Sequence, residues 1–366
     1  MTRVALLGAT GSIGRQALEV MAAHPELELV AATSGSTSID GLAPLTQVGG
    51  DPTELLERAR PDVVLNATLG FAGLLATMWA LERGVRLALA NKESLVAAGE
   101  LATAAHARGG GELIPVDSEH SALFQCAQLG DPESLVLTAS GGPFRGRTRA
   151  ELQDVTPDEA LAHPTWTMGA KITVDSATLA NKGLEVIEAH FLFGVAYDRI
   201  EVVVHPTSIV HGLVRFRDGA SIAHLGYPDM RVPISYALTF PKRATTPVPP
   251  LRLETLEFHE PDPGTFRMLP LAREAGERGG TYPCAYNAAN EVAVQAFLEG
   301  RIGFLDIAAL VEDVLARVDG APARDLEELV EADRRARELV PVARRRGLDG
   351  GGGTAEVPAL QARGRE

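Results

Sequence analysis

The sequence predicts an α/β fold whose first third is a doubly wound parallel sheet. Short β-rich runs alternate with helical segments between Arg3 and Val116, a pattern that favours parallel strands joined by right-handed crossovers. A glycine-rich turn directly follows the first β-rich run, as in folds that bind dinucleotides. With 366 residues, 45% of them hydrophobic, the chain is long enough for two or three domains with buried cores.

The first region is expected to contain five strands and four helices. The strands are predicted at 3–7, 27–32, 62–66, 86–90 and 113–116, and the helices at 16–23, 54–59, 74–81 and 100–108. The stretch between Gly35 and Asp51 has little periodicity, so we expect a loop or a truncated strand–helix unit there. Residues 1–116 therefore form the expected Rossmann-like, cofactor-binding domain.

From Asp117 the pattern changes to α+β, and we expect a second domain over 117–240, which the metal- and substrate-binding residues given below make the catalytic domain. Its strands are predicted at 135–138, 200–205, 213–216 and 221–225, with a helix at 177–193. Residues 241–263 are rich in proline and indicate an extended linker. Four helical segments at 266–275, 287–298, 307–317 and 326–339 indicate a small C-terminal helical domain over 264–345. The glycine-rich stretch 346–366 is expected to be a disordered tail.

Composition excludes several classes of protein. The count of 34 Lys and Arg against 48 Asp and Glu gives a net charge of −14, which argues against a nucleic-acid partner. Cys126 and Cys284 are too few for a disulfide framework or a cysteine-rich zinc site, so we expect a reducing, cytoplasmic setting. No signal peptide is visible, and the uncharged window 63–81 contains too many polar residues and glycines for a membrane span.

The glycine-rich turn GATGSIG (8–14) is the expected site of a dinucleotide. Its glycines permit a tight turn, and its backbone N–H groups can approach a pyrophosphate at a helix N-terminus. The alternative is a strand–helix turn without a ligand. After the second strand, Gly35, Ser36 and Thr37 stand where an NAD site usually has a carboxylate, so NADP is favoured over NAD.

Acidic residues indicate a site for a hard divalent cation such as Mg2+ or Mn2+. Asp117 and Glu119 follow a strand, and in an extended segment residues two apart share one face, so their carboxylates can converge. Glu185 could complete the metal site. The alternative for Asp117 and Glu119 is a solvated acidic loop.

The stretch 174–185 combines groups that can hold a phosphate. Asn181, Lys182 and Glu185 project to one side of a helix, and Lys182, Asn181 and Ser176 could bind a phosphate through charge and directional donors. The alternative is an ordinary amphipathic helix with an intrahelical ion pair.

Lys92 follows a strand at the ligand-binding edge of the predicted sheet. Its alternative is a surface helix start, with Asn91 as the cap and Lys92 and Glu93 solvated. The segment 140–169 is marked by glycine and proline, so Trp166 and Met168 could close over a substrate or simply pack on the core. The histidines at 163, 205, 211 and 224 are not diagnostic alone.

Together these motifs resemble the 1-deoxy-D-xylulose-5-phosphate reductoisomerase family from Gly8 to about Val340. The strings that carry the resemblance are GATGSIG (8–14), ANKESLV (90–96), IPVDSEH (114–120), ASGGPF (139–144), HPTWTMG (163–169), VDSATLANKGLE (174–185), HPTSIVHG (205–212), PDMR (228–231) and NAANEVAVQAFL (287–298). No single string is specific, but the set is.

The resemblance implies an NADP-dependent oxidoreductase with isomerase activity. It would convert 1-deoxy-D-xylulose 5-phosphate to 2-C-methyl-D-erythritol 4-phosphate in non-mevalonate isoprenoid biosynthesis, with NADPH and Mg2+ or Mn2+, as a homodimer. The expected chemistry is metal-assisted rearrangement, by retro-aldol cleavage and re-aldol addition, followed by hydride transfer to the aldehyde.

The resemblance also assigns residues, motif by motif. The implied metal ligands are Asp117, Glu119 and Glu185. The implied catalytic residues are these three together with Lys92 and His163. The implied substrate contacts are Lys92, Ser118, Glu119, Ser140, His163, Trp166, Met168, Ser176, Asn181, Lys182, Glu185, His211 and Met230. The implied cofactor contacts are Gly8, Thr10, Gly11, Ser12, Ile13, Gly14, Gly35, Ser36, Thr37, Asn91, Glu93 and Gly169.

The sequence departs from the family after the second strand. The family usually has a Gly-Lys-Asn-like stretch there, whose lysine meets the 2′-phosphate of NADPH, whereas this chain has Gly35-Ser36-Thr37. The segment from Gly35 to Val63 is also shorter than usual. The departure concerns selectivity for NADPH and leaves the expected reaction unchanged.

Two other functions are weighed against this one. A semialdehyde-type dehydrogenase can begin with a similar glycine-rich turn, but it needs a nucleophilic cysteine, and Cys126 has the pattern of a buried helical residue. A non-catalytic NADPH-binding sensor would not need Asp117, Glu119 and Glu185 together.

Overall fold

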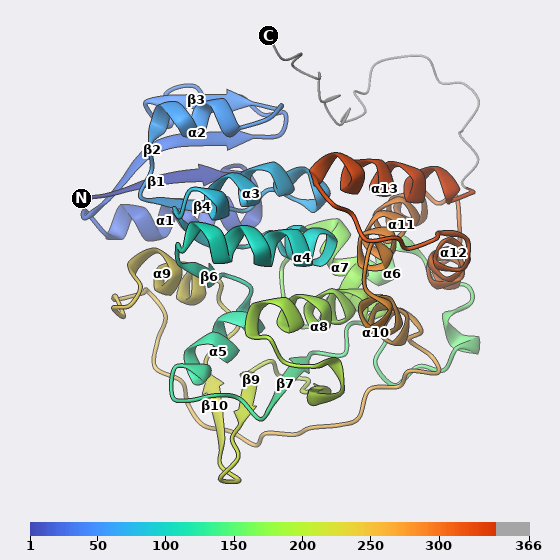
Figure 1. Cartoon of the computed structure of the whole chain (residues 1–366). Coiled ribbons are helices and arrows are strands. Elements are labelled where there is room, and N and C mark those ends of the chain that lie inside the picture. The colour runs from blue at the N-terminus through green and yellow to red at the C-terminus, as the bar shows by residue number, and fades with distance from the viewer. Residues whose placement is uncertain (342–366) are drawn as a thin grey trace.

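The computed structural model describes residues 1–341, and Figure 1 shows their arrangement. The expected tail at 346–366 lies outside the described residues, as do the last residues of the expected helical domain. A six-stranded sheet and a four-stranded sheet lie in different parts of the molecule, with a group of C-terminal helices beside them.

The first sheet confirms the predicted doubly wound α/β class. Its strand order is β3-β2-β1-β4-β5-β6, and every neighbouring pair is parallel. The strands are β1 (Thr2–Leu7), β2 (Leu27–Ser34), β3 (Leu45–Val48), β4 (Val63–Asn66), β5 (Arg86–Leu89) and β6 (Leu113–Pro115). The helices of this region are α1 (Ser12–Ala23), α2 (Thr53–Ala59), the 3-10 turn η1 (Gly70–Gly73), α3 (Leu74–Glu82) and α4 (Lys92–Gly109).

Alternate residues of each strand serve the two faces of this sheet. Ala5 and Leu7 of β1 join a core with residues of α2, α3 and α4, whereas Val4 and Leu6 join a second core with residues of α1 and α9 (Arg231–Thr239). This division follows from the period of two in a β-strand. A helix from far along the chain therefore completes the cover of the first sheet.

The second sheet has the order β10-β9-β7-β8, in which β7 and β8 are parallel and the other pairs antiparallel. Its strands are β7 (Ser134–Ala139), β8 (Ile200–Val204), β9 (Val210–Arg215) and β10 (Ser221–Leu225). The intervening helical elements are α5 (Ser118–Ala127), η2 (Ala150–Leu152), α6 (Pro157–Leu161), α7 (Ala170–Thr178), α8 (Ala180–Phe193) and η3 (Tyr197–Arg199). This mixed sheet with its helices confirms the predicted α+β character.

Four helices follow the extended segment 241–263: α10 (Met268–Arg278), α11 (Tyr282–Leu298), α12 (Phe304–Arg317) and α13 (Leu326–Leu339). Apolar residues of α10, α11 and α12 share one core with β7, β8 and α8. The C-terminal helices thus support the helix that carries Glu185.

Three local predictions were wrong, each for a physical reason. Helix α4 begins at Lys92 rather than near residue 100, because residues 92–99 are buried all round and show no amphipathic pattern. The helix predicted at 177–193 is two helices, because Leu179 adopts a left-handed conformation with φ of 60°. The segment of Asp117 and Glu119 is the start of helix α5, because the Asp117 side chain caps that helix.

The uncharged window 63–81 forms β4, η1 and α3 of the first sheet region. Across residues 1–341, none of the helices has both the length and the apolar character that a membrane crossing requires.

Candidate active site

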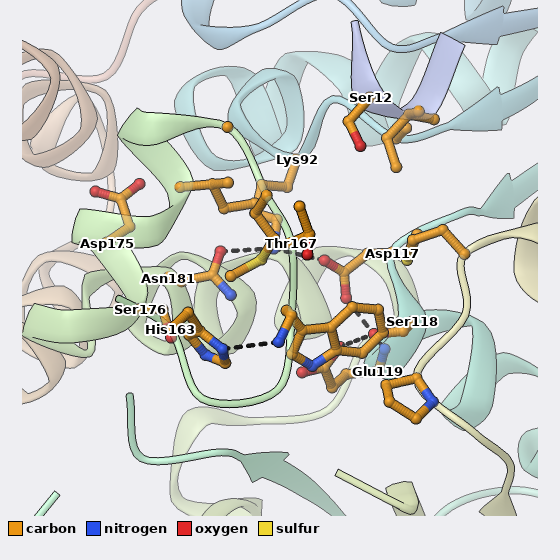
Figure 2. Close-up of a pocket in the computed structure, with 18 of the residues that line it drawn as sticks. Ser12, Lys92, Asp117, Ser118, Glu119, His163, Thr167, Asp175, Ser176 and Asn181 are labelled. Atoms are coloured by element: carbon orange, nitrogen blue, oxygen red, sulfur yellow. Dashed lines mark hydrogen bonds and ion pairs between the residues drawn. The ribbon is translucent and has the colours of Figure 1, made fainter. Parts of the chain in front are cut away.

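One cavity of about 530 Å3 opens beside the carboxyl ends of the first sheet, a size typical of small-molecule sites. Figure 2 shows Ser12 at one end of it and His163 and Ser176 at the other, with Lys92, Asp117 and Asn181 between them. The cavity therefore contains both the glycine-rich turn and the predicted phosphate-binding residues.

The three predicted metal ligands come together at this cavity: Asp117 and Glu119 line it, and Glu185 is fully buried against them. Asp117 caps helix α5, and its Oδ1 atom accepts hydrogen bonds from the backbone N–H groups of Glu119 (3.2 Å) and His120 (3.4 Å). Glu119 lies in the first turn of that helix, and Glu185 lies on α8. One carboxylate oxygen from each of the three lies within 4.8 Å of the others. The convergence was predicted correctly, but it arises from a helix start and not from an extended strand.

Two lysines neutralise this acidic cluster. The Lys92 Nζ atom lies 2.5 Å from Asp117 and 3.1 Å from Glu185, and Lys182 Nζ lies 2.7 Å from Glu119 and also contacts Glu185. Burial alone would lower the pKa of Lys92, but Asp117 and Glu185 raise it well above its usual value. Lys92 is 4% exposed and Glu93 is 7% exposed, so the alternative of a solvated surface helix start was wrong.

The whole sequence contains only four lysines, and three of them lie at this cavity: Lys92, Lys171 and Lys182. The fourth is Lys242. Lys171 Nζ lies 2.6 Å from Asp175 and 3.6 Å from Glu93. The chain uses arginine almost everywhere else, so ammonium groups are concentrated at the cavity.

A second layer behind Asp117 was not predicted. His120 Nδ1 lies 3.2 Å from Asp117 Oδ1 and 3.1 Å from Glu188 Oε2, and its Nε2 lies 3.0 Å from the carbonyl oxygen of Glu185. Burial opposes a charged ring, but Glu188 and Asp117 raise the pKa of His120 to about 9. Burial raises the pKa of Glu188 to about 7. Helical spacing could have revealed both residues, since each lies three positions after a predicted ligand.

The predicted phosphate-binding residues line one end of the cavity. His163 Nδ1 accepts hydrogen bonds from the backbone N–H of Thr165 (3.1 Å) and Trp166 (2.9 Å), so Nε2 carries the proton and donates to Ser140 Oγ at 3.0 Å. Burial lowers the pKa of His163, which keeps the ring neutral. Ser176 lies at the end of α7 and Asn181 at the start of α8, so the break at Leu179 brings their helices together.

The segment before α7, which was predicted to close over a substrate, and the remaining predicted substrate contacts also line the cavity. Trp166, Met168 and Gly169 come from the stretch before α7, and His211 and Met230 come from β9 and the start of α9. The rings of Trp166 and His211 lie 6.3 Å apart. Ser118, whose hydroxyl hydrogen-bonds Glu119, lies beside them in the lining.

The glycine-rich turn is tight, and two of its glycines are required by its geometry. Gly8 has φ of +84°, and a Cβ atom at Gly14 would lie 2.2 Å from the Gly8 carbonyl oxygen. Gly11, Ser12 and Ile13 line the cavity. Gly8, Thr10 and Gly14 shape the turn from outside the lining.

Other predicted cofactor contacts divide into two groups. Glu93 and Gly169 line the cavity, whereas Asn91 is buried and donates to the carbonyl oxygens of Thr68 (2.7 Å) and Gly70 (2.8 Å). Asn91 therefore fixes the loop after β4. Gly35, Ser36 and Thr37 lie outside the lining, after the end of β2.

The donor set fits a hard divalent cation. Three carboxylates offer oxygen ligands of the kind that Mg2+ and Mn2+ prefer, and the two ammonium groups now among them show that positive charge is favoured at this position. Burial and the Glu119 carboxylate raise the pKa of Glu185, which is the effect expected of buried carboxylates that lie close together.

Comparisons with known proteins agree with these motifs. Family models described as 1-deoxy-D-xylulose 5-phosphate reductoisomerase match residues 4–49 and 46–99, its C-terminal domain matches 113–193, and the DXP reductoisomerase C-terminal domain matches 225–339. The 1-deoxy-D-xylulose 5-phosphate reductoisomerase of Thermomicrobium roseum is 49% identical over 92% of this chain and 96% of that protein. The enzyme of the same name from Geobacillus kaustophilus is 47% identical over 93% and 99%.

Solved structures show the same relationship. A DOX-P reductoisomerase crystallised with NADPH, fosmidomycin and magnesium superposes with a TM-score of 0.86 at 36% identity, covering 93% of this chain and 97% of that one. The Zymomonas mobilis enzyme in complex with NADPH gives a TM-score of 0.84 at 38% identity, covering 93% and 98%. The chain belongs to the 1-deoxy-D-xylulose 5-phosphate reductoisomerase family.

Proposed function

We propose that this protein converts 1-deoxy-D-xylulose 5-phosphate to 2-C-methyl-D-erythritol 4-phosphate, with NADPH and Mg2+ or Mn2+, as a step of non-mevalonate isoprenoid biosynthesis. The observation that carries the proposal is the meeting of Asp117, Glu119 and the buried Glu185 at the cavity whose lining includes Asp117, Glu119 and the glycine-rich turn.

Asp117, Glu119 and Glu185 are the residues that would hold the cation. When bound, a divalent cation supplies Lewis acidity that polarises the oxygens of the ketone and its neighbouring hydroxyl. His120 and Glu188 keep the Asp117 carboxylate in place, because His120 contacts both side chains. Such support of a ligand fixes its orientation toward a metal.

Lys92 and Lys182 would change partners when the cation binds. Both ammonium groups now rest on the three carboxylates, which a cation would neutralise instead. Lys92 is then free to stabilise negative charge that develops on a substrate oxygen. Lys182 is then free to bind the substrate phosphate together with Ser140, Ser176 and Asn181.

The phosphate end anchors the substrate away from the reacting carbons. The neutral His163 ring orients the Ser140 hydroxyl, and this remote binding energy holds the reacting end in position. Trp166 and Met168 cover the cavity and would exclude water from the aldehyde before it is reduced. The turn at Gly11, Ser12 and Ile13 would hold the pyrophosphate of NADPH. The nicotinamide ring of the same cofactor supplies the hydride.

The thiols do not support a semialdehyde-type dehydrogenase. Cys126 and Cys284 are both buried, and burial raises the pKa of Cys126 to about 11, the opposite of what an activated nucleophile requires.

We also propose the domain division 1–116, 117–240, 241–263 and 264–345, a cytoplasmic location and a homodimer. The free, buried cysteines support a reducing compartment, and the family resemblance supports the dimer. Light scattering of the purified protein tests the dimer directly.

The deciding experiment is spectrophotometric oxidation of NADPH in the presence of 1-deoxy-D-xylulose 5-phosphate, with Mg2+, with Mn2+ and with EDTA. We expect absorbance at the nicotinamide band to fall only when both substrate and cation are present. The absence of substrate-dependent oxidation with either cation would refute the proposed reaction.

A further inference from the structure

The adenosine end of the cofactor site has an unusual distribution of charge. In a doubly wound sheet the ribose 2′ position lies at the carboxyl end of the second strand, and here β2 ends at Ser34. The sequence has no Lys or Arg between positions 16 and 57 and no Asp or Glu between 29 and 39. The strand end therefore offers neither a carboxylate for a 2′-hydroxyl nor a cation of its own for a 2′-phosphate.

An arginine from helix α1 lies against the glycine-rich turn. The exposed side chain of Arg15 folds back over the glycine-rich turn, where its Nη1 atom donates to the Thr10 carbonyl oxygen at 2.5 Å. Within residues 1–341, no carboxylate forms an ion pair with Arg15. Four of the five donors of a guanidinium group are therefore available for a ligand.

Backbone hydrogen bonds join the turn that Arg15 contacts to the end of β2. The backbone N–H groups of Gly8 (3.1 Å) and Ala9 (2.8 Å) both donate to the carbonyl oxygen of Thr33. Arg15 thus contacts Thr10, and the neighbouring residue Ala9 is hydrogen-bonded to Thr33 near the end of β2.

The loop after β2 leaves neutral donors on the surface there. The Ser34 hydroxyl is bonded to the Thr37 carbonyl oxygen, which closes the turn, and Ser36 and Thr37 are exposed. Asp40, the nearest acidic residue along this loop, accepts a hydrogen bond from Ser38 Oγ at 2.9 Å.

We propose that Arg15 is the residue that selects NADPH over NADH, by binding the 2′-phosphate with its guanidinium group. A guanidinium fork matches phosphate oxygens in geometry as well as in charge, and Ser36 and Thr37 add neutral hydrogen bonds. The cation thus comes from the helix after the first strand and not from the loop after the second. The inference rests on the proposed function, because it names the selectivity residue of that cofactor site.

The test measures the binding of NADPH and of NADH to the protein through the change in nicotinamide fluorescence, with no substrate or cation present. The two ligands differ only in the 2′-phosphate. For Arg15→Ala we expect NADPH affinity to fall about tenfold or more, the scale of a lost charge-assisted contact, with NADH affinity unchanged. The NADPH affinity of Arg15→Lys should lie between those of the natural protein and Arg15→Ala, because lysine keeps the charge but lacks the forked guanidinium group.

Arg58→Ala is the matched control, because Arg58 is an exposed arginine of the same sheet region, on α2. It should bind both cofactors as the natural protein does. Equal weakening of NADPH and NADH in Arg15→Ala would assign Arg15 a structural role and overturn the inference, as would unchanged NADPH binding. The proposed reaction is tested separately, by substrate-dependent oxidation of NADPH by the natural protein. If that oxidation occurs but the preference for NADPH does not depend on Arg15, only the inference about Arg15 fails.

Discussion

Replacing Lys92 with methionine tests whether a buried ammonium group neutralises the carboxylates of the site. Lys92 Nζ lies 2.5 Å from Asp117, and its side chain is 5% exposed, so Lys92→Met removes the charge while filling similar volume. Removing one partner of a buried ion pair is strongly destabilising because it leaves an uncompensated charge.

The size of the loss depends on pH, because an orphaned carboxyl group can fold in its protonated form. Holding it protonated costs about 1.4 kcal/mol for each pH unit above its unperturbed pKa, which is near 4. The loss in free energy of unfolding is therefore limited to about 4 kcal/mol at pH 7 and about 1.4 kcal/mol at pH 5.

The sign follows from Asp117. Burial alone would raise the pKa of Asp117, but Lys92 and His120 lower it well below its usual value. A lowered acid pKa contributes its full stability above the unfolded value, so in the natural protein this contribution is the same at pH 5 and pH 7. In Lys92→Met the orphaned carboxyl group must take up a proton to fold, and this costs less as the pH falls toward its unfolded pKa. The difference between the natural protein and Lys92→Met should therefore shrink toward acid pH.

Urea unfolding followed by circular dichroism, in EDTA at pH 5 and pH 7, measures this difference. Lys242→Met is the control, because Lys242 is exposed and lies outside the cavity. An equal loss for Lys92→Met at both pH values, or no loss beyond the control at pH 7, would refute the role of Lys92 as the neutralising group.

Three further changes test the roles of other groups. Glu185→Gln should lower cation-dependent turnover about a thousandfold, because it removes a charged ligand of a Lewis-acid site, while NADPH binding by fluorescence stays unchanged; near-normal turnover would contradict the metal assignment, and the exposed Glu201→Gln is its control. Lys182→Ala should raise the KM for the phosphorylated substrate about tenfold or more, and an unchanged KM would remove Lys182 from the phosphate site. Iodoacetamide at pH 8 should leave activity intact, because burial raises the pKa of Cys126 to about 11 and that of Cys284 well above its usual value, which leaves little thiolate; rapid inactivation would favour the semialdehyde-type alternative.

The sequence was a good guide wherever one face of an element is buried. The strands around the glycine-rich turn and the helices after residue 264 were predicted close to their observed bounds, because period and turn residues specify them. Helix α4 was misjudged at its start because residues 92–99 contact protein on all sides. Strand β3 was left undecided between a loop and a truncated strand–helix unit, since it is short and half-exposed. Helix α9 was missed, because it is defined by its distant packing on the first sheet.

The site shows the same division. Asp117 and Glu119 could be predicted to converge from their spacing, whereas Glu185 lies far along the chain and was joined to them by the family resemblance. The present partners of Lys92 and Lys182 could not be predicted, since they depend on how α4, α5 and α8 pack. The layer of His120 and Glu188 behind the ligands is a product of the same packing.

The central claim is that three carboxylates share one divalent cation beside the cofactor-binding turn. Titration with Mn2+, followed by electron paramagnetic resonance of the free ion, measures this sharing without requiring turnover. We expect one tight Mn2+ per chain in the natural protein, and marked weakening in each of Asp117→Asn, Glu119→Gln and Glu185→Gln. Tight binding that survives all three substitutions would place the cation elsewhere and contradict the account.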